Sequence, residues 1–147
     1  MQLILFIGIP GTGKSSFYKE RFYRTHLRLN LDMLRTRHRE QLLYTACLES
    51  KTQVVIDSTN LTKARRARYI TPAREVGYEV HGYFFESRVA DAKLRNALRE
   101  GEERLPDGAI HGASGKLELP AMEEGFEKLF FVRLAEGNQF VVEDWKV

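Results

Sequence analysis

The sequence predicts an α/β domain in which a mostly parallel sheet carries helices on both faces. Two observations support this fold class. Short apolar, partly β-branched runs alternate with helix-compatible runs along the chain, which is the pattern of a parallel sheet with helical crossovers. The chain has 147 residues, of which 43% are hydrophobic and 29% charged, values that suit one globular domain spanning 1–147.

The individual elements follow from the same alternation of patterns. We expect strands near residues 2–7, 27–30, 53–57, 78–85, 128–133 and 139–143. We expect helices near residues 14–24, 33–49, 62–75, 89–100 and 107–116. Pro72 should kink or restart its helix, with Thr71 as the new cap. Gly137-Asn138 suits the turn of a final hairpin that adds a β edge to the sheet.

A glycine-rich segment follows the first expected strand. It matches the phosphate-loop pattern G-x-x-x-x-G-K-[ST] at every fixed position, with the residues Gly8-Ile9-Pro10-Gly11-Thr12-Gly13-Lys14-Ser15. Glycines let the backbone approach phosphate oxygens, which the loop amides and the start of the next helix then bind. In such a loop Lys14 would reach the β- and γ-phosphates and Ser15 would ligate Mg²⁺. A glycine-rich turn that binds nothing is the alternative, and the flanking strand and helix argue against it.

Two charged side chains follow the second expected strand, Asp32 and Arg35. Ligands of open parallel sheets bind at the carboxyl ends of the strands. Each of these residues therefore has a possible functional role as well as a structural one. Asp32 suits either a helix N-cap or a general base that takes a proton from an acceptor hydroxyl. Arg35 suits either a solvated helix position or a bidentate contact with an acceptor phosphate.

The third expected strand ends in an acid, Asp57. It resembles a Walker B segment, in which the acid lies near magnesium or the acceptor, whereas a strand-end Asx turn is the structural alternative. The helix expected next begins with four basic residues, at positions 63, 65, 66 and 68. We interpret them as a solvated helix face in preference to a nucleic-acid path.

A second basic stretch predicts a lid. Arg95 and Arg99 are spaced i, i+4, which places them on one face of a helix. The dense charged segment 99–104, with its glycine, looks like a mobile flap. A positive lid is expected in phosphoryl transfer, where electrostatic stabilisation does most of the work. An ordinary salt-bridged helix is the alternative.

The bulk composition narrows the remaining possibilities. The net charge is +3, but residues 1–40 carry eight Lys/Arg against three Asp/Glu, and residues 117–147 carry three against seven. A basic N-terminal half suits polyanionic partners. Cys47 is the lone cysteine, so an internal disulfide is excluded and a packed helical position is expected. No apolar run could cross a bilayer, and we expect a cytoplasmic protein without a membrane partner.

Several segments together resemble one family, the 5′-OH polynucleotide kinase domain of phage polynucleotide kinase-phosphatase and of bacterial RNA-repair enzymes. The resemblance runs over most of the chain and also includes Leu105-Pro106 and Glu124-Gly125-Phe126, for which we otherwise expect only a turn that packs Phe126. The segments that carry it are Gly8 to Phe17, Asn30-Leu31-Asp32-Met33-Leu34-Arg35, Asp57-Ser58-Thr59-Asn60-Leu61 and Arg95-Asn96-Ala97-Leu98-Arg99.

The resemblance implies a P-loop kinase with sheet order 2-3-1-4-5, a helical lid, and transfer of the γ-phosphate of ATP to 5′-OH ends of DNA or RNA with Mg²⁺. It implies that Asp32 activates the hydroxyl and that Arg99, supported by Arg95, stabilises the transferring phosphate. It places acceptor contacts at Arg35, Asp57 and Asn60, and metal contacts at Ser15 and Asp57. The nucleotide contacts it implies are Gly8, Pro10, Gly11, Thr12, Gly13, Lys14, Ser15, Ser16 and Arg95.

Departures from the family pattern leave alternatives open. No phosphatase or ligase module is expected here, so the domain would act alone or with separate repair enzymes. Leu31 and Met33 flank Asp32 and make the mouth of the pocket more apolar, a difference that bears on the acceptor and not on the kinase chemistry. A kinase for a small metabolite or nucleoside uses the same scaffold. A nucleotide-dependent switch is a third possibility, although it would not need the pair Asp32 and Arg35.

Overall fold

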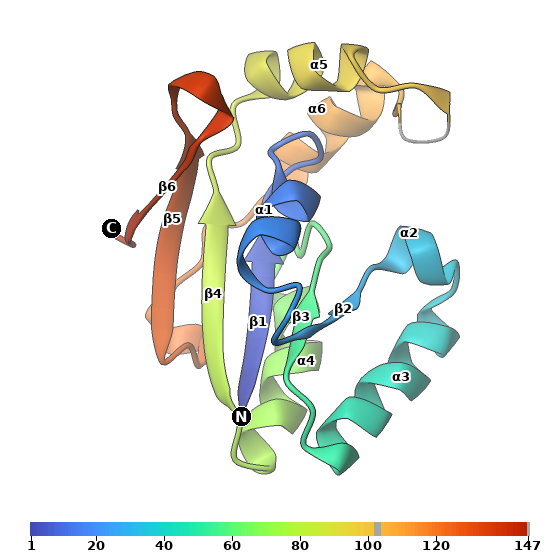
Figure 1. Ribbon diagram of the computed structural model, residues 1–147, viewed down its shortest axis with the longest axis vertical. Coiled ribbons are helices and arrows are strands. Elements are labelled where there is room, and N and C mark those ends of the chain that lie inside the picture. The colour runs from blue at the N-terminus through green and yellow to red at the C-terminus, as the bar shows by residue number, and fades with distance from the viewer. Residues whose placement is uncertain (102–103, 147) are drawn as a thin grey trace.

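The computed structural model describes residues 1–101 and 104–146. Its centre is a six-stranded sheet of order β2-β3-β1-β4-β5-β6 (Figure 1). The first five strands are parallel and β6 runs antiparallel to β5. The predicted order 2-3-1-4-5 and the hairpin edge are therefore confirmed. The strands are β1 (Gln2–Ile7), β2 (Leu27–Leu29), β3 (Val54–Ile56), β4 (Glu79–Phe85), β5 (Lys128–Leu134) and β6 (Phe140–Asp144).

Within the described residues, six α-helices and two 3₁₀ turns connect these strands. Figure 1 shows α5 and α6 beyond the carboxyl ends of β1 and β4, where a helical lid was expected. The helices are α1 (Lys14–Arg21), α2 (Leu31–Leu34), α3 (Arg37–Ser50), α4 (Lys63–Glu75), α5 (Val89–Ala97) and α6 (Asp107–Lys116), with 3₁₀ turns η2 (Met122–Glu124) and η3 (Glu136–Asn138).

Strand β1 is buried on both of its faces. Because successive side chains of a strand point to opposite faces, Leu3 and Leu5 enter a core with residues of α3 and α4. Ile4 and Phe6 enter a second core, where Phe17 of α1 is buried. The sheet is thus covered by helices on both faces, as predicted, and β1 delivers the chain to the glycine-rich loop with no exposed residue between Leu3 and Ile9.

The expected helix at 33–49 is two helices, so that prediction was wrong. Arg35 has a φ of 75° and separates α2 from α3. Each helix has its own polar cap: the Asn30 side chain accepts a hydrogen bond from the Met33 amide at 2.9 Å, and Thr36 accepts one from Arg39 at 3.2 Å. Two N-cap residues six positions apart favour two helices over one.

Two further helix boundaries differ from expectation. Helix α4 continues through Pro72 to Glu75 without restarting at Thr71, because buried residues Tyr69, Ile70 and Ala73 hold that segment against the sheet. Helix α5 ends at Ala97 rather than near residue 100. Arg95 and Arg99 therefore do not share a helical face.

Two other expectations about packing agree with the structure. Cys47 is buried in α3, and burial raises the pKa of its thiol. Phe126 packs over Gly82 of β4, where an added Cβ would lie 2.7 Å from the Phe126 ring. Across the described part of the chain, no helix combines the length and apolar character that a membrane crossing needs.

Candidate functional site

The glycine-rich loop lies between β1 and α1 and is packed from outside by the lid helices. Ile9 is fully buried against Ala92 of α5 and Ile110 of α6. Gly11 has a φ of +82°, and a Cβ there would lie 2.8 Å from the Ala92 carbonyl oxygen. A glycine is needed at this position both for the backbone conformation and for the close approach of α5.

Lys14 folds its side chain back over this loop. Its Nζ donates to the carbonyl oxygens of Gly8 and Ile9 at 3.0 and 2.7 Å, and to the Thr12 hydroxyl at 3.3 Å. The pKa of Lys14 is lowered to about 8, chiefly by burial and in smaller part by the positive charge of Arg99, while the carboxylates of Asp57 and Asp32 oppose the shift. The amine of Lys14 is therefore mostly protonated at pH 7. The oxygen atoms of the loop fix its position through these hydrogen bonds.

Asp57 sits where β3 ends, next to the start of α1. Its Oδ2 accepts a hydrogen bond from the Ser15 hydroxyl at 3.0 Å and one from Arg28 Nε at 2.7 Å. The Asp57 side chain is 2% exposed. Serine and aspartate oxygens are hard ligands of the kind that Mg²⁺ prefers, so the predicted metal pair of Ser15 and Asp57 is brought together in the structure.

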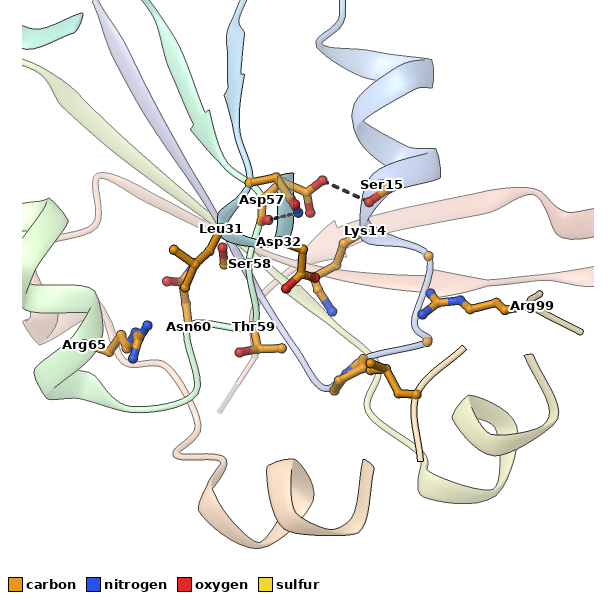
Figure 2. Close-up of a pocket in the computed structure, with 15 residues that line it drawn as sticks. Lys14, Ser15, Leu31, Asp32, Asp57, Ser58, Thr59, Asn60, Arg65 and Arg99 are labelled. Carbon is orange, nitrogen blue, oxygen red and sulfur yellow. Dashed lines mark hydrogen bonds between the residues drawn. The ribbon is translucent and has the colours of Figure 1, made fainter. Parts of the chain in front are cut away.

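Asp32 lies in the first turn of α2 and is not a helix cap, since Asn30 has that role. Asn30 also donates from Nδ2 to the Asp57 carbonyl oxygen at 2.8 Å, which ties α2 to the end of β3. Figure 2 shows the Asp32 carboxylate directed toward the Lys14 amine. The structure thus places a carboxylate and an ammonium group across one cavity.

That cavity has a volume of about 200 Å³ and combines predicted and unpredicted residues. Figure 2 shows Arg99 on one side and Arg65 on the other, with Lys14 and Asp32 between them. The predicted residues that line it are Pro10, Gly11, Gly13, Lys14, Ser15, Asp32, Asp57, Asn60 and Arg99. Leu31, which the sequence interpretation placed at the mouth of the pocket, also lines it, whereas no site role had been assigned to the other lining residues, Asn30, Ser58, Thr59, Arg65 and Leu105.

Five predicted site residues are outside this lining: Gly8, Thr12, Ser16, Arg35 and Arg95. Gly8 and Thr12 instead form the loop that Lys14 binds. Arg35 is exposed at the break between α2 and α3. Arg95 donates to the Gly11 carbonyl oxygen at 3.1 Å, so it supports the loop from the lid side.

Arg99 reaches the cavity because a buried asparagine fixes the segment that follows α5. Asn96 is 1% exposed and makes two hydrogen bonds to the backbone of Leu105, donating to its oxygen at 2.6 Å and accepting from its nitrogen at 2.8 Å. These bonds join the end of α5 to Leu105, next to the segment that carries Arg99. Of the flap predicted at 99–104, residues 102 and 103 lie outside the described residues.

Arg66 is an exception to the solvated face predicted for the basic run on α4, on which Lys63 and Arg68 are exposed. Its side chain is fully buried and forms a bidentate ion pair with Glu124 of η2, at 2.8 and 3.1 Å. Its third nitrogen donates to the Asn60 carbonyl oxygen at 2.8 Å. The Asn60 side chain donates to the Phe6 carbonyl oxygen at 2.7 Å. Asn60, predicted to bind the acceptor, thereby also joins β1 to the segment after β3.

Arg65, the neighbour of Arg66, points the other way and lines the cavity. Burial lowers the pKa of Arg65, with the positive charge of Arg37 contributing next. Because side chains one position apart on a helix face in different directions, one arginine of the pair stabilises the fold and the other reaches the site. The sequence pattern alone had grouped them together.

Comparison with known proteins agrees with this geometry. A model of the AAA domain family matches residues 3–120, which include the glycine-rich loop, Asp32, Asp57 and the lid. The chain belongs to this family. The family-level prediction of a P-loop kinase domain is thereby confirmed.

Among the relatives, the bifunctional polynucleotide phosphatase/kinase of Schizosaccharomyces pombe is 26% identical over 129 residues, which cover 85% of this chain and 32% of that protein. The P-loop kinase domain described here thus spans about a third of that relative.

Solved structures share the fold. Chaetomium thermophilum Kti12, in complex with ADP-AlF3, superposes with a TM-score of 0.67 at 18% identity, covering 92% of both chains. A gluconokinase from Sinorhizobium meliloti superposes with a TM-score of 0.64 at 18% identity, covering 92% of this chain and 83% of that one. The predicted fold class is confirmed.

Proposed function

We propose that this P-loop kinase domain transfers the γ-phosphate of ATP to the 5′-hydroxyl of a nucleic-acid strand. One observation carries the proposal: a single cavity brings Lys14, Asp32 and Arg99 together, with Arg65 at the opposite end. A pure nucleotide switch needs the loop and the metal pair but has no use for a carboxylate facing them or for a second arginine beyond it. The arrangement therefore favours transfer to an acceptor.

The donor phosphates would be bound on the side of Lys14 and Arg99. Loop amides and Lys14 would hold the β- and γ-phosphates, and Arg99 would stabilise the negative charge of the transferring group. Ser15 and Asp57 fit Mg²⁺, because their oxygens are 3.0 Å apart beside the loop. When bound, the ion would neutralise charge on the donor phosphates. We therefore keep ATP and Mg²⁺ as the proposed donor and cofactor.

The acceptor would enter on the side of Arg65. Asp32 would accept the proton of the attacking hydroxyl as a general base, and Arg65 would bind a phosphate of the strand by a bidentate contact. Arg35 is exposed nearby on α2 and would contact the strand farther from the reacting hydroxyl. The polynucleotide acceptor is also supported by the S. pombe relative, which is named as a polynucleotide kinase.

A small-molecule kinase is the second candidate. It is favoured by the modest cavity of about 200 Å³ and by the likeness of the fold to a gluconokinase. Leu31, an apolar residue beside Asp32, is compatible with either acceptor. A test with several acceptors separates the two candidates.

The deciding experiment supplies ATP labelled at the γ-phosphate, Mg²⁺, and one of four acceptors: a 5′-OH oligonucleotide, a 3′-nucleoside monophosphate, a nucleoside, or gluconate. We expect label on the oligonucleotide, and a loss of transfer on the order of 10²-fold or more in Lys14→Ala or Arg99→Ala. Label on the nucleoside or gluconate alone would refute the polynucleotide acceptor. ATP hydrolysis without label on any acceptor would refute the kinase.

Asp32→Asn tests the proposed base separately from nucleotide binding. We expect it to abolish transfer while leaving ATP affinity within about twofold, because the amide keeps the shape of the carboxylate but accepts no proton. Asp144→Asn is a matched control, since Asp144 is exposed at the end of β6. A collapse of ATP affinity in Asp32→Asn would assign Asp32 a structural role instead.

A further inference from the structure

The Arg28 guanidinium of β2 occupies the same oxygens that would hold a metal ion. Its Nε donates to Asp57 Oδ2 at 2.7 Å, and a terminal nitrogen donates to the Ser15 hydroxyl oxygen at 3.0 Å. The Ser15 hydroxyl itself donates to the same Oδ2 at 3.0 Å. The three groups form a closed triangle, which we call the Arg28 clasp.

The fold holds the Arg28 clasp in place from two directions. Strands β2 and β3 pair in register, with Arg28 opposite Val55 and the Asp57 amide bonded to the Leu29 carbonyl oxygen at 2.9 Å. On the other side, the guanidinium lies 5.9 Å from the centre of the Tyr18 ring of α1, a cation–π distance. Arg28 is 27% exposed, against 2% for Asp57. Arg28 is therefore a partly exposed cation in direct contact with the buried carboxylate of Asp57.

We propose that Arg28 is a positioning residue that keeps Ser15 and Asp57 closed on each other and competes with the divalent cation of the bound nucleotide. An oxygen lone pair that accepts from a guanidinium N–H is not available to a metal ion. A cation at the guanidinium position also repels a second cation placed between the same oxygens. The metal with its nucleotide therefore binds only as Arg28 withdraws toward solvent, on its exposed side.

This proposal rests on the metal role assigned above to Ser15 and Asp57. It does not depend on the acceptor, since any kinase or nucleotide switch with this loop would load the same ion. It makes Arg28 a determinant of how much Mg²⁺ the site requires. When a nucleotide binds without metal, Arg28 keeps its hydrogen bonds to Asp57 and Ser15. Arg28 should therefore affect metal-dependent nucleotide binding much more than metal-free binding.

The test titrates Mg²⁺ into the full chain with a fluorescent ADP analogue and no acceptor, and reads the Mg²⁺ concentration that gives half of the metal-dependent gain in affinity. A parallel titration follows Mn²⁺ by electron paramagnetic resonance. In Arg28→Gln we expect this Mg²⁺ concentration to fall about tenfold or more, with metal-free ADP affinity changed less than about twofold. Arg28→Lys should lie between, because lysine keeps the charge but lacks the two-donor fork.

Arg21→Gln is the matched control. It removes one positive charge from the neighbouring α1 at a surface position whose side chain is 47% exposed and pairs with Glu20. The control should behave as the wild type. Equal Mg²⁺ requirements in wild type, Arg28→Gln and Arg28→Lys would overturn the proposal, and so would a higher requirement, since Arg28 would then support the metal ligands. Absence of transfer to an oligonucleotide would refute the proposed function and leave this result standing.

Discussion

The buried ion pair between Arg66 and Glu124 provides a quantitative test of what holds the site's scaffold. In Glu124→Gln the guanidinium would stay fully buried without a counter-charge. The neutral amide offers one acceptor oxygen in place of two, so one of the bonds at 2.8 and 3.1 Å is lost and the other is weakened. Breaking a buried pair from one side costs about 3–5 kcal/mol. We expect a loss near the lower end, about 3 kcal/mol, because the amide keeps one bond.

Urea unfolding followed by circular dichroism measures this loss. With an m-value of about 2 kcal/mol per molar, the midpoint should fall by about 1.5 M. Glu143→Gln is the control, since its pair with Arg133 is 3.4 Å long and half exposed, and should lose at most about 1 kcal/mol. The double variant Arg66→Met/Glu124→Leu should lose less than Glu124→Gln, because no buried charge is left unpaired.

Glu124→Gln should also make the segment after β3 less stable against local opening. Arg66 donates to the Asn60 carbonyl oxygen, and the adjacent Thr59 carbonyl oxygen accepts from the Gly8 amide at 3.0 Å. Hydrogen exchange at the Gly8 amide should therefore be faster in Glu124→Gln than in Glu143→Gln. If Glu124→Gln unfolds at the same urea concentration as Glu143→Gln, the ion pair does not support the scaffold and this reasoning is refuted.

Two further predictions concern the glycine-rich loop. Nucleotide affinity should fall as the pH rises through about 8, because the ammonium of Lys14 loses its proton there. Between about pH 8 and 10.5 the folded protein binds fewer protons at Lys14 than the unfolded chain does. The contribution of Lys14 to the free energy of unfolding therefore becomes more favourable as the pH rises through this range. Fluorescent-ADP titrations from pH 7 to 9.5 measure the affinity, and a flat wild-type profile, or a matching fall in Lys14→Met, would contradict the assignment. Gly13→Ala should lower both ADP affinity and stability, the latter by about 1–3 kcal/mol, because its φ is +92° and a Cβ would lie 3.1 Å from the Phe140 ring. Gly108→Ala, with nothing within 4 Å of its Cβ, should be neutral or slightly stabilising, and equal urea midpoints for the two variants would refute the steric argument.

The parts of the site that the sequence predicted are those written in local patterns. The run from β1 through Gly13 to Lys14 is contiguous, so its spacing alone indicates a phosphate loop. Asp32 and Asp57 each end or follow a strand of a parallel sheet, which brings them to the same edge. The break at Arg35 also had a local sequence signal, the two N-cap residues Asn30 and Thr36. We missed it because the apolar pattern over 33–49 favoured one continuous helix.

The parts that were missed depend on pairing between distant segments. Arg66 looked solvated because its neighbours on α4 are basic, and its partner Glu124 is 58 positions away along the chain. The role of Asn96 was not predicted, because it depends on the folded chain bringing the backbone of Leu105 next to the Asn96 side chain. Arg28 sits on a three-residue strand whose pairing with β3 decides what it touches. Side-chain partners at such separations follow from the assembled sheet, and a pattern of residue types does not encode them.

Under the proposed function, we expect the acceptor to be selected at assembled positions of this kind. The sheet and loop superpose on both Kti12 and a gluconokinase, so the shared scaffold does not distinguish one acceptor from another. Under the proposed function, the residues that select the acceptor belong to the cavity lining around Arg65 of α4, and Leu31 of α2 is another residue of that lining. Leu31 gives the cavity apolar surface, and Arg65 adds a cation with a fork geometry suited to a phosphate. A strand end carries both an apolar base face and a phosphate, whereas a plain nucleoside offers no phosphate to Arg65. The role proposed for Arg65 therefore predicts a phosphate-bearing acceptor.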